Sequence, residues 1–300
     1  MSMTKQEIEK ELQHLMDNHP EMLEEMSNGL GAKETPSSAK AATLGARIAG
    51  KITTKGYTNS SLATLKKLSP NCSSPRNHTI DRITPHHTAG VLSVESALEW
   101  FSKTSTQASC NYVIGNDGRI GLCCEERNRA WTSSSRLNDN RSITWEICNS
   151  GWKDDGWPIS EKSFEAAVAL ATDICKRYGK KKLLWIPDSA KALAYEPKAD
   201  EMILTKHEWF SNTCCPGPSL GARFDELAQR TTKNLNPTEE EEEEMVRYKT
   251  VDEMPKWAQE DVQKLIDAGF LKGKGGDAGL DLTEDMARTL IICGRMLGVL

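Results

Sequence analysis

The middle of the chain, from about Tyr57 to Asn236, alternates short apolar and β-branched runs with longer stretches of helical periodicity. The segment 111–124 predicts two strands joined by an Asn-Asp-Gly turn, which is a strong hairpin signal, and 142–150 predicts another short strand. The segments 94–103 and 161–179 repeat apolar residues at spacings of three and four, and therefore predict helices. This alternation predicts a layered α/β architecture.

The ends of the chain differ from this middle region. Residues 1–56 predict a helical N-terminal arm, interrupted at Pro20, that continues into a linker rich in Gly, Ala, Ser and Thr. Six consecutive glutamates lie within the segment 237–245, which predicts an acidic linker because like charges repel and stay solvated. We therefore expect a central domain at 57–236 and a small, mainly helical domain at 246–300.

Charge and composition limit the functions to be considered. The chain has 38 Lys and Arg against 43 Asp and Glu, so we expect no nucleic-acid partner. It has no run of the roughly 20 apolar residues that span a bilayer, so we expect no membrane partner. The N-terminus lacks the apolar run of a secretory signal, which predicts cytoplasmic synthesis. The odd number of cysteines, nine, then favours reduced thiols.

Two adjacent histidines, His86 and His87, end a short β-branched and apolar run in ITPHHTAG. Alone they are weak evidence for a metal, because a histidine beside a strand is more often a structural side chain. However, His207 stands eight residues before Cys215, which is followed by a Pro-Gly pair. Such a segment can present imidazole and thiolate to one ion, with a third ligand from a distant strand. Three protein ligands leave the fourth tetrahedral position open, as in a catalytic zinc site.

Four motifs, in the order ITPHHTAG, NYVIGNDGRI, SITWEICNS and KHEWFSNTCCPG, resemble the zinc-dependent N-acetylmuramoyl-L-alanine amidases related to peptidoglycan recognition proteins, particularly phage endolysins. The resemblance covers roughly residues 57–230. It implies a mixed central β-sheet flanked by helices. It also implies a peptidoglycan hydrolase that cleaves the amide between N-acetylmuramic acid and L-alanine with a zinc-activated water. Peptidoglycan is then the partner, and the bacterial cell wall, reached after release, is the place of action.

The same resemblance implies the metal ligands. The first zinc ligand matches His86, the second matches His207, and the third matches Cys215, since the family's cysteine immediately precedes Pro-Gly. His87 would then be a neighbouring structural residue. His87 and Cys214 remain the alternatives to this assignment. Two imidazoles and a soft thiolate suit Zn²⁺ well.

Amide hydrolysis also needs a group that takes a proton from the attacking water and returns one to the leaving amine. The resemblance implies Glu146, and the alternative is a surface glutamate on an edge strand. Some family members instead use a tyrosine before the hairpin strand and a lysine two residues before the ligand cysteine. Those positions hold Cys110 and Thr213 here, while Tyr112 is expected in the core. The Thr213 hydroxyl could donate a hydrogen bond to a developing oxyanion.

Substrate contacts are expected in the loop RAWTSSSRLNDN, where the family touches glycan or peptide. Trp131, Thr132 and Asn140 are the candidates there, and the alternative is an ordinary surface loop with one packed tryptophan. Pro85 is unusual for the family. Because proline cannot donate to a sheet ladder, it suggests an edge position or a bulge.

The segment 248–275 resembles the small helical modules, similar to S-layer homology repeats, that are appended to such amidases. It would then bind the cell wall, and the alternative is a stabilising or oligomerisation unit. For the whole chain, the alternative to an enzyme is a peptidoglycan-binding protein without catalysis. Such relatives characteristically lose the metal cysteine, so the set of His86, His207 and Cys215 favours the enzyme.

Overall fold

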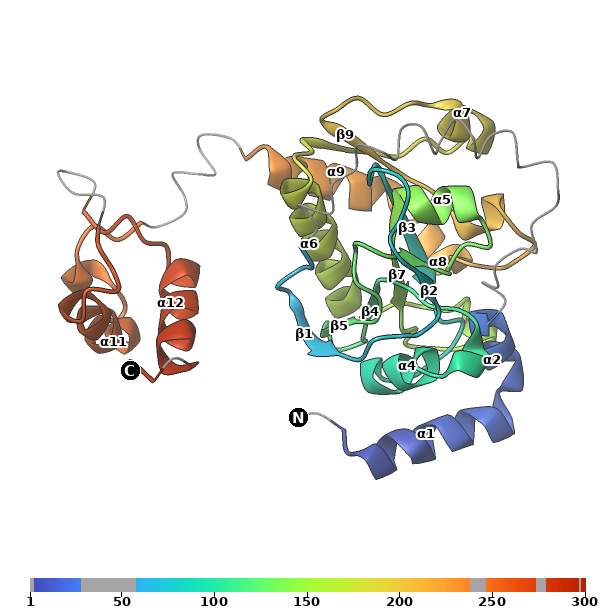
Figure 1. The fold of residues 1–300 in the computed structure, drawn as a ribbon, viewed down its shortest axis with the longest axis horizontal. Coiled ribbons are helices and arrows are strands. Elements are labelled where there is room, and N and C mark those ends of the chain that lie inside the picture. Colours follow the sequence, from blue (N-terminus) through green and yellow to red (C-terminus); the bar gives the residue numbers. More distant parts are fainter. Residues whose placement is uncertain (1–2, 28–57, 238–246, 274–278, 297) are drawn as a thin grey trace. The chain divides into compact units, whose positions relative to one another are not determined.

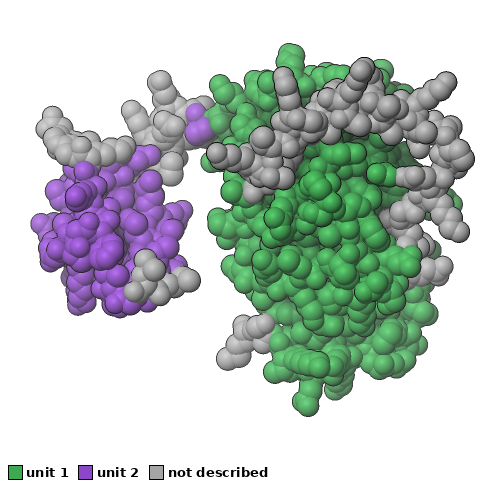
Figure 2. All heavy atoms as spheres, viewed as in Figure 1, with its two compact units in different colours: residues 1–236 green, residues 237–300 purple. Residues whose placement is uncertain are grey.

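The computed structural model describes residues 3–27, 58–237, 247–273, 279–296 and 298–300. The chain forms two compact units, Met1–Asn236 and Pro237–Leu300, which we call unit 1 and unit 2 (Figures 1 and 2). The six glutamates and the linker-like segment 28–57 lie outside the described residues.

Unit 1 combines a sheet with helices of very different length. Its strands are β1 (Ala63–Lys66), β2 (Cys72–Ser73), β3 (Arg82–His87), β4 (Tyr112–Ile114), β5 (Ile120–Leu122), β6 (Arg129–Ala130), β7 (Ser142–Ile147), β8 (Lys182–Leu184) and β9 (Glu201–Leu204). Its α-helices are α1 (Lys5–Asn18), α2 (Pro20–Ser27), α4 (Val94–Phe101), α5 (Arg136–Arg141), α6 (Glu161–Arg177), α7 (Ser189–Ala194), α8 (Gly217–Gly221) and α9 (Phe224–Leu235). Short 3-10 turns are η2 (Thr104–Thr106), η3 (Lys153–Asp155) and η4 (His207–Trp209).

The central sheet has seven strands in the order β1-β5-β4-β7-β3-β9-β8. The strands β4 and β5 pair antiparallel, whereas the other neighbours in the sheet pair parallel. The predicted hairpin at 111–124 is therefore β4 and β5, and the helices predicted at 94–103 and 161–179 are α4 and α6. Ser93 and Ser160 cap these two helices by accepting hydrogen bonds from backbone N–H groups. The predicted mixed sheet flanked by helices is confirmed.

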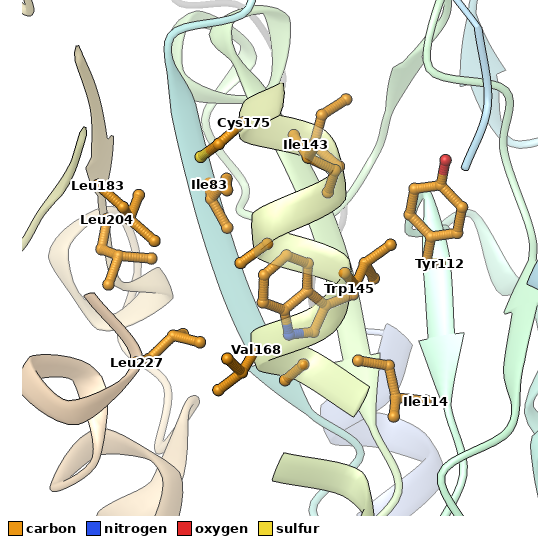
Figure 3. Packing of buried hydrophobic residues seen from close by; sticks show 14 of the residues in the cluster. Ile83, Tyr112, Ile114, Ile143, Trp145, Val168, Cys175, Leu183, Leu204 and Leu227 are labelled. Atoms are coloured by element: carbon orange, nitrogen blue, oxygen red, sulfur yellow. The ribbon is translucent and has the colours of Figure 1, made fainter. Parts of the chain in front are cut away.

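One face of the sheet forms the main hydrophobic core with α6 and α9. In Figure 3, Ile83 of β3 and Trp145 of β7 lie against Val168 of α6, with Leu227 of α9 beside them. Successive side chains of a strand point to opposite faces, so Glu146, next to Trp145, points away from this core.

The other face of the sheet is covered by α4 and by the two N-terminal helices. Val113 of β4 packs in a second cluster with Leu98 of α4, Leu15 of α1 and Met22 of α2. The helix α1 contacts both α2 and α4, and Figure 1 shows the three helices beside one another. The N-terminal helices are therefore part of unit 1.

Unit 2 is built from the 3-10 turn η5 (Val251–Glu253) and the helices α11 (Lys256–Asp267) and α12 (Glu284–Met296). Tyr248 and Leu282 form an isolated antiparallel bridge. These two residues share a small core with Ala258 and Val262 of α11 and Ile291 of α12. Within the part of the chain that the structure describes, neither unit contains a helix long and apolar enough to cross a membrane.

Candidate metal centre

The first two residues of the site face each other on neighbouring strands. His86 of β3 is directly opposite Glu146 of β7 in the parallel ladder, and Glu146 also pairs with Val113 of β4. Both side chains are buried, with 1% and 6% of their surface exposed. The His86 Nδ1 atom lies 4.0 Å from Glu146 Oε1. Since β7 lies between β3 and β4, the alternative of a glutamate on an edge strand is wrong.

Pro85 explains how His207 reaches the site beside His86. The carbonyls of Asp81 and Ile83 accept hydrogen bonds from Ile203 N and Thr205 N. The backbone N–H and C=O groups of the odd-numbered residues of β3 therefore point toward β9. Pro85 has no N–H to continue that ladder, and the pairing between β3 and β9 ends at Ile83. The chain after β9 then leaves the sheet and enters η4, whose first residue is the buried His207.

Cys215 approaches from the loop between η4 and α8. Its Sγ atom lies 3.3 Å from His86 Nδ1. The loop is held by hydrogen bonds from Cys215 N to Thr213 Oγ1, 3.1 Å, and from Glu208 N to the Cys215 carbonyl, also 3.1 Å. Gly217 has a φ of +74°, and a Cβ there would lie 2.7 Å from a His87 ring carbon. The left-handed backbone and this close approach both require glycine.

Together, His86, His207 and Cys215 form a group suited to a metal ion. Their ligand atoms all lie within 4.8 Å of one another, and the two imidazole centroids are 4.8 Å apart. Tetrahedral coordination at the usual Zn–S and Zn–N lengths would place sulfur and nitrogen about 3.5 Å apart, close to the distance between Cys215 and His86. The donor set and its spacing therefore fit Zn²⁺.

The electrostatics of the two histidines also fit a metal. The Nε2 atom of His207 is buried and has no hydrogen-bond partner among the described residues, and the Nδ1 atom of His86 faces the Cys215 thiol. Burial, helped by the neighbouring imidazoles of His207 and His87, holds the pKa of His86 well below its usual value. Burial lowers the pKa of His207 to about 4. Both rings are therefore neutral at pH 7, as metal ligands must be.

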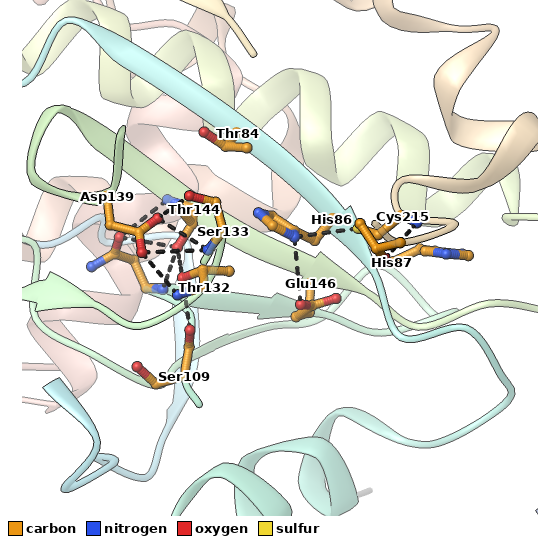
Figure 4. Close-up of polar contacts among 12 residues, drawn as sticks. Thr84, His86, His87, Ser109, Thr132, Ser133, Asp139, Thr144, Glu146 and Cys215 are labelled. Carbon is orange, nitrogen blue, oxygen red and sulfur yellow. Dashed lines mark hydrogen bonds and ion pairs between the residues drawn. The ribbon is translucent and has the colours of Figure 1, made fainter. Parts of the chain in front are cut away.

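The alternative ligands His87 and Cys214 lie beside this group. Cys214 Sγ is 4.0 Å from His87 Nε2, and the His87 ring meets Trp157 edge-on at 5.3 Å between centroids. Burial lowers the pKa of His87 to about 3. Figure 4 shows His86 and His87 extending from β3 in different directions, with Cys215 near both. The compact group of possible ligands among the described residues contains neither His87 nor Cys214.

A small cavity of about 10 Å³ adjoins the group. Glu146, His207 and Cys215 line it, together with Trp131 and Thr132 from the predicted substrate loop. Asn140 does not line it. Its side chain instead accepts a hydrogen bond from Asn77 N and donates one to the Arg136 carbonyl, so it ties α5 to the neighbouring loop.

Asp139 is a residue near the site that the sequence did not single out. Its carboxylate accepts hydrogen bonds from Thr132 N, Ser133 N and Ser133 Oγ, and so it fixes the loop that lines the cavity. Burial raises the pKa of Asp139 to about 6, although these hydrogen bonds lower it. The sequence RLNDN gave no sign of this role, because an aspartate in such a segment is equally common on a surface turn.

Cys110 and Thr213, the two positions that depart from the pattern expected from the sequence, lie in different surroundings. Cys110 is fully buried against the cluster under α4, and burial holds the pKa of its thiol well above the usual value. Tyr112 is also fully buried and donates a hydrogen bond to Glu126, as expected for a core residue. The Thr213 hydroxyl oxygen accepts a hydrogen bond from Cys215 N, so Thr213 supports the loop that carries the cysteine.

Residues 76–218 match the model of the N-acetylmuramoyl-L-alanine amidase family, and this match contains His86, Glu146, His207 and Cys215. It covers slightly less than half of the chain. No curated protein matches the chain.

Solved structures show a distant likeness to unit 1. The structure of PlyL is 18% identical with a TM-score of 0.42, and the match covers 57% of this chain and 97% of that one. The selenomethionine derivative of AmpD is 18% identical with a TM-score of 0.38, covering 57% and 96%. The endolysin amidase LysCS from Clostridium intestinale URNW is 14% identical with a TM-score of 0.35, covering 56% and 95%. At these identities and scores the likenesses concern the fold alone.

Proposed function

We propose that unit 1 is an N-acetylmuramoyl-L-alanine amidase that hydrolyses the amide between N-acetylmuramic acid and the L-alanine of the stem peptide. The observation that carries this proposal is the convergence of His86, His207 and Cys215, whose ligand atoms lie within 4.8 Å of one another beside Glu146. The family match over 76–218 supports the bond specificity. We further propose that the enzyme is an endolysin, which is released to act on the cell wall.

The three clustered residues would hold Zn²⁺. Their neutral imidazoles and the soft thiolate provide a donor set that suits this ion, with His86 Nδ1 facing Cys215 Sγ and the buried Nε2 of His207 without a hydrogen-bond partner among the described residues. Bound there, Zn²⁺ supplies a Lewis acid for the amide carbonyl and lowers the pKa of a water to about 7.

Glu146 is the proposed general base and acid. Its carboxylate lies at the cavity and within 4.0 Å of a proposed ligand, so it is near the reacting atoms. It accepts the proton of the attacking water and then delivers a proton to the nitrogen of the departing L-alanine. The carbon–nitrogen bond breaks, and the products are a lactyl carboxylate on the glycan and a free peptide amine.

The remaining roles concern orientation. We propose that Trp131 and Thr132, which line the cavity, contact the glycan or the peptide. Asn140 is proposed as a third contact, at the end of α5, where its amide also bonds to Asn77 N and the Arg136 carbonyl. The Thr213 hydroxyl oxygen accepts a hydrogen bond from Cys215 N, and this contact does not use the O–H group that would donate to developing negative charge. Its established contact makes a supporting role for the cysteine loop the simpler proposal.

The proposal is tested by digesting purified cell walls with the zinc-loaded protein and analysing the products by mass spectrometry. We expect new free L-alanine amino termini. The variant Cys215→Ser should lose both zinc and activity, whereas Cys214→Ser, a matched change at the neighbouring residue, should keep both. Equal lysis by the wild type and Cys215→Ser would refute the enzymatic mechanism. Wall binding without new amino termini would instead favour a peptidoglycan-binding protein without catalysis.

For unit 2 we propose a second wall-binding module, joined to unit 1 by the acidic linker. Two weak sites on one chain raise the residence time on a polymer without any new contact at either site. Removal of residues 246–300 should therefore weaken binding to cell walls, while hydrolysis of short soluble fragments is unchanged. If sedimentation instead shows that this truncation converts a dimer into a monomer, the unit serves oligomerisation.

A further inference from the structure

We infer that the N-terminal hairpin, α1 and α2, is a cover that closes the candidate metal centre and must move before peptidoglycan can enter. This inference rests on the proposed function and concerns the regulation of the same site. The key observation is that Met26 of α2 lines the cavity together with Glu146, His207 and Cys215. In the sequence, Met26 is more than a hundred residues away from each of them.

The covered site is too small for its proposed substrate. The cavity beside the metal ligands has a volume of about 10 Å³, which is roughly the space of one water. Pockets that bind organic ligands usually measure about 300–1,000 Å³. A glycan strand with its stem peptide therefore cannot reach Glu146 while Met26 occupies this position.

The hairpin is held by apolar side chains that follow its helical spacing. Leu12 and Leu15 of α1 and Met22, Leu23 and Met26 of α2 are all buried, with at most 5% of their surface exposed. They pack against residues such as Leu98 and Phe101 of α4. Phe101 also lines the cavity, so the surface on which the hairpin rests continues into the site.

Polar contacts fix the position of the hairpin. The Glu11 carboxylate accepts hydrogen bonds from Ser93 N, 2.8 Å, and Ser93 Oγ, 2.6 Å, at the N-terminus of α4. The imidazole of His19 stacks on Trp152, with 3.6 Å between centroids and 15° between planes. None of these four residues lines the cavity or belongs to the ligand group, so their contacts orient the hairpin.

The topology allows the hairpin to leave while the fold persists. Among the described residues, α1 and α2 form no ladder with the sheet, whose seven strands lie between Ala63 and Leu204. The helix α4 covers the same face of the sheet, and its intrahelical hydrogen bonds do not involve the hairpin, although the N–H of its N-cap residue Ser93 would lose Glu11 as its acceptor. Displacement therefore costs side-chain contacts and exposes apolar surface, but it breaks no strand pairing.

Met26→Glu is the first test, because it places a carboxylate in the closed cavity beside Glu146. Burying a second charge there is unfavourable, so the variant should favour the open hairpin. We expect at least a tenfold faster release of L-alanine amino termini from cell walls, since activity scales with the fraction of open molecules. The matched control is Met16→Glu, at an exposed position of α1, which should behave like the wild type.

A second measurement does not depend on catalysis. In the metal-free protein, alkylation of Cys215 by iodoacetamide can be followed by peptide mass spectrometry. The thiol is buried beside the closed cavity, so the wild type and Met16→Glu should react slowly. Met26→Glu should react at least tenfold faster, with an unchanged circular dichroism spectrum as evidence that the fold is retained.

A disulfide lock provides the opposite test. A Cβ built on Gly90 lies 2.7 Å from Met22 Cγ, so the two Cβ atoms of a Met22→Cys, Gly90→Cys double variant lie within about 4.2 Å. This separation is suitable for a disulfide. The oxidised double variant should cleave cell walls at least tenfold more slowly than the same protein reduced with a phosphine. Wild type treated identically accounts for oxidation of the native cysteines.

These outcomes separate the cover from the proposed function. Faster Cys215 alkylation in Met26→Glu, with no wall cleavage by any variant, supports the cover and refutes the amidase. Wall cleavage at equal rates by wild type, Met26→Glu and the oxidised lock, with equal alkylation rates, supports the amidase and overturns the cover.

Discussion

Two buried polar regions share one face of strands β3 and β7, yet they differ in how their hydrogen-bonding groups are used. Thr84 and Thr144 are opposite each other in the ladder, and two residues further along the same strands His86 is opposite Glu146. The Thr144 hydroxyl shares a hydrogen bond with the Thr132 hydroxyl, and the Thr84 hydroxyl shares hydrogen bonds with those of Ser142 and Thr205. Figure 4 shows the two regions side by side.

The two regions differ in whether their buried polar atoms have hydrogen-bond partners. Asp139, which lies beside the threonines, accepts hydrogen bonds from the backbone and side chain of the loop, so the polar network closes on itself. In the candidate metal centre the Nε2 atom of His207 has no partner among the described residues, and the Nδ1 atom of His86 faces the Cys215 thiol. A buried polar atom without a partner costs about 1–3 kcal/mol. A place that keeps such an atom beside a second imidazole and a thiol is therefore a candidate for a ligand, whereas the hydrogen bonds of Asp139 serve the fold.

The largest effect that tests this comparison is expected at Glu146. The change Glu146→Gln keeps the shape of the side chain but removes its ability to accept a proton. We expect kcat for wall hydrolysis to fall by about 10²–10⁴, the usual contribution of a general acid and base. Zinc content, measured by atomic absorption, should stay at the wild-type level. A loss of zinc together with activity would instead make Glu146 part of the metal site.

The second prediction concerns the metal as a source of stability. Zinc that binds only the folded protein should stabilise it by about 2.7 kcal/mol at a concentration one hundred times its Kd. His207→Ala removes one of the three proposed ligands, so added zinc should no longer raise the melting temperature measured by calorimetry. An equal rise in wild type and variant would show that the ion binds elsewhere. The change His78→Ala, at a half-buried histidine outside the ligand group, serves as the control.

The third prediction moves to the polar network. Asp139→Ala leaves the backbone N–H groups of Thr132 and Ser133 without their acceptor, and we expect a loss of about 2 kcal/mol in the free energy of unfolding. Zinc affinity should be unchanged, because the hydrogen bonds of the Asp139 carboxylate come from Thr132 and Ser133, which are not proposed ligands. KM for cell-wall fragments should rise as the loop with Trp131 loosens. Reduced zinc affinity in this variant would mean that the two regions are coupled.

The same contrast explains how much the sequence could predict. Local signals sufficed for α4, α6 and the β4–β5 hairpin, since their spacing, caps and turn residues lie within each segment. The grouping of His86, His207 and Cys215 followed from motifs whose chemistry is recognisable. Their roles, and those of Glu146 and Thr213, stay predictions.

Other features depended on contacts between distant segments. The helical spacing at the N-terminus predicted a helical arm interrupted at Pro20, but nothing in it showed that Met26 would reach the candidate metal centre. The hydrogen bond that Asn140 accepts from Asn77 N joins two segments far apart in the sequence, and the residue type alone does not predict it. Asp139 gains its role only when the loop folds back over it. Such roles come from long-range packing, which a single sequence does not display.

The smallest effect is the pH dependence that Asp139 gives to stability. Its pKa is raised to about 6 in the folded protein, chiefly by burial, from an ordinary value near 3.8. Between these values the folded state retains a proton that the unfolded state has released, so the free energy of unfolding rises as the pH falls. From pH 6 to pH 5 this group should add about 1 kcal/mol, at 1.36 kcal/mol for each unit of pKa shift.

Asp139→Asn isolates this contribution, because asparagine does not titrate and has nearly the same shape. The free energy of unfolding is measured with denaturant at pH 5 and pH 6 for both proteins. The value for the wild type minus the value for the variant should be about 1 kcal/mol larger at pH 5 than at pH 6. The groups of the metal centre titrate in both proteins, so their contribution cancels in this comparison. A difference that is the same at both pH values would mean that the hydrogen bonds to Thr132 and Ser133 outweigh burial. The Asp139 carboxylate would then be charged at both pH values, and the hydrogen bonds that it accepts would be enough to stabilise this buried charge.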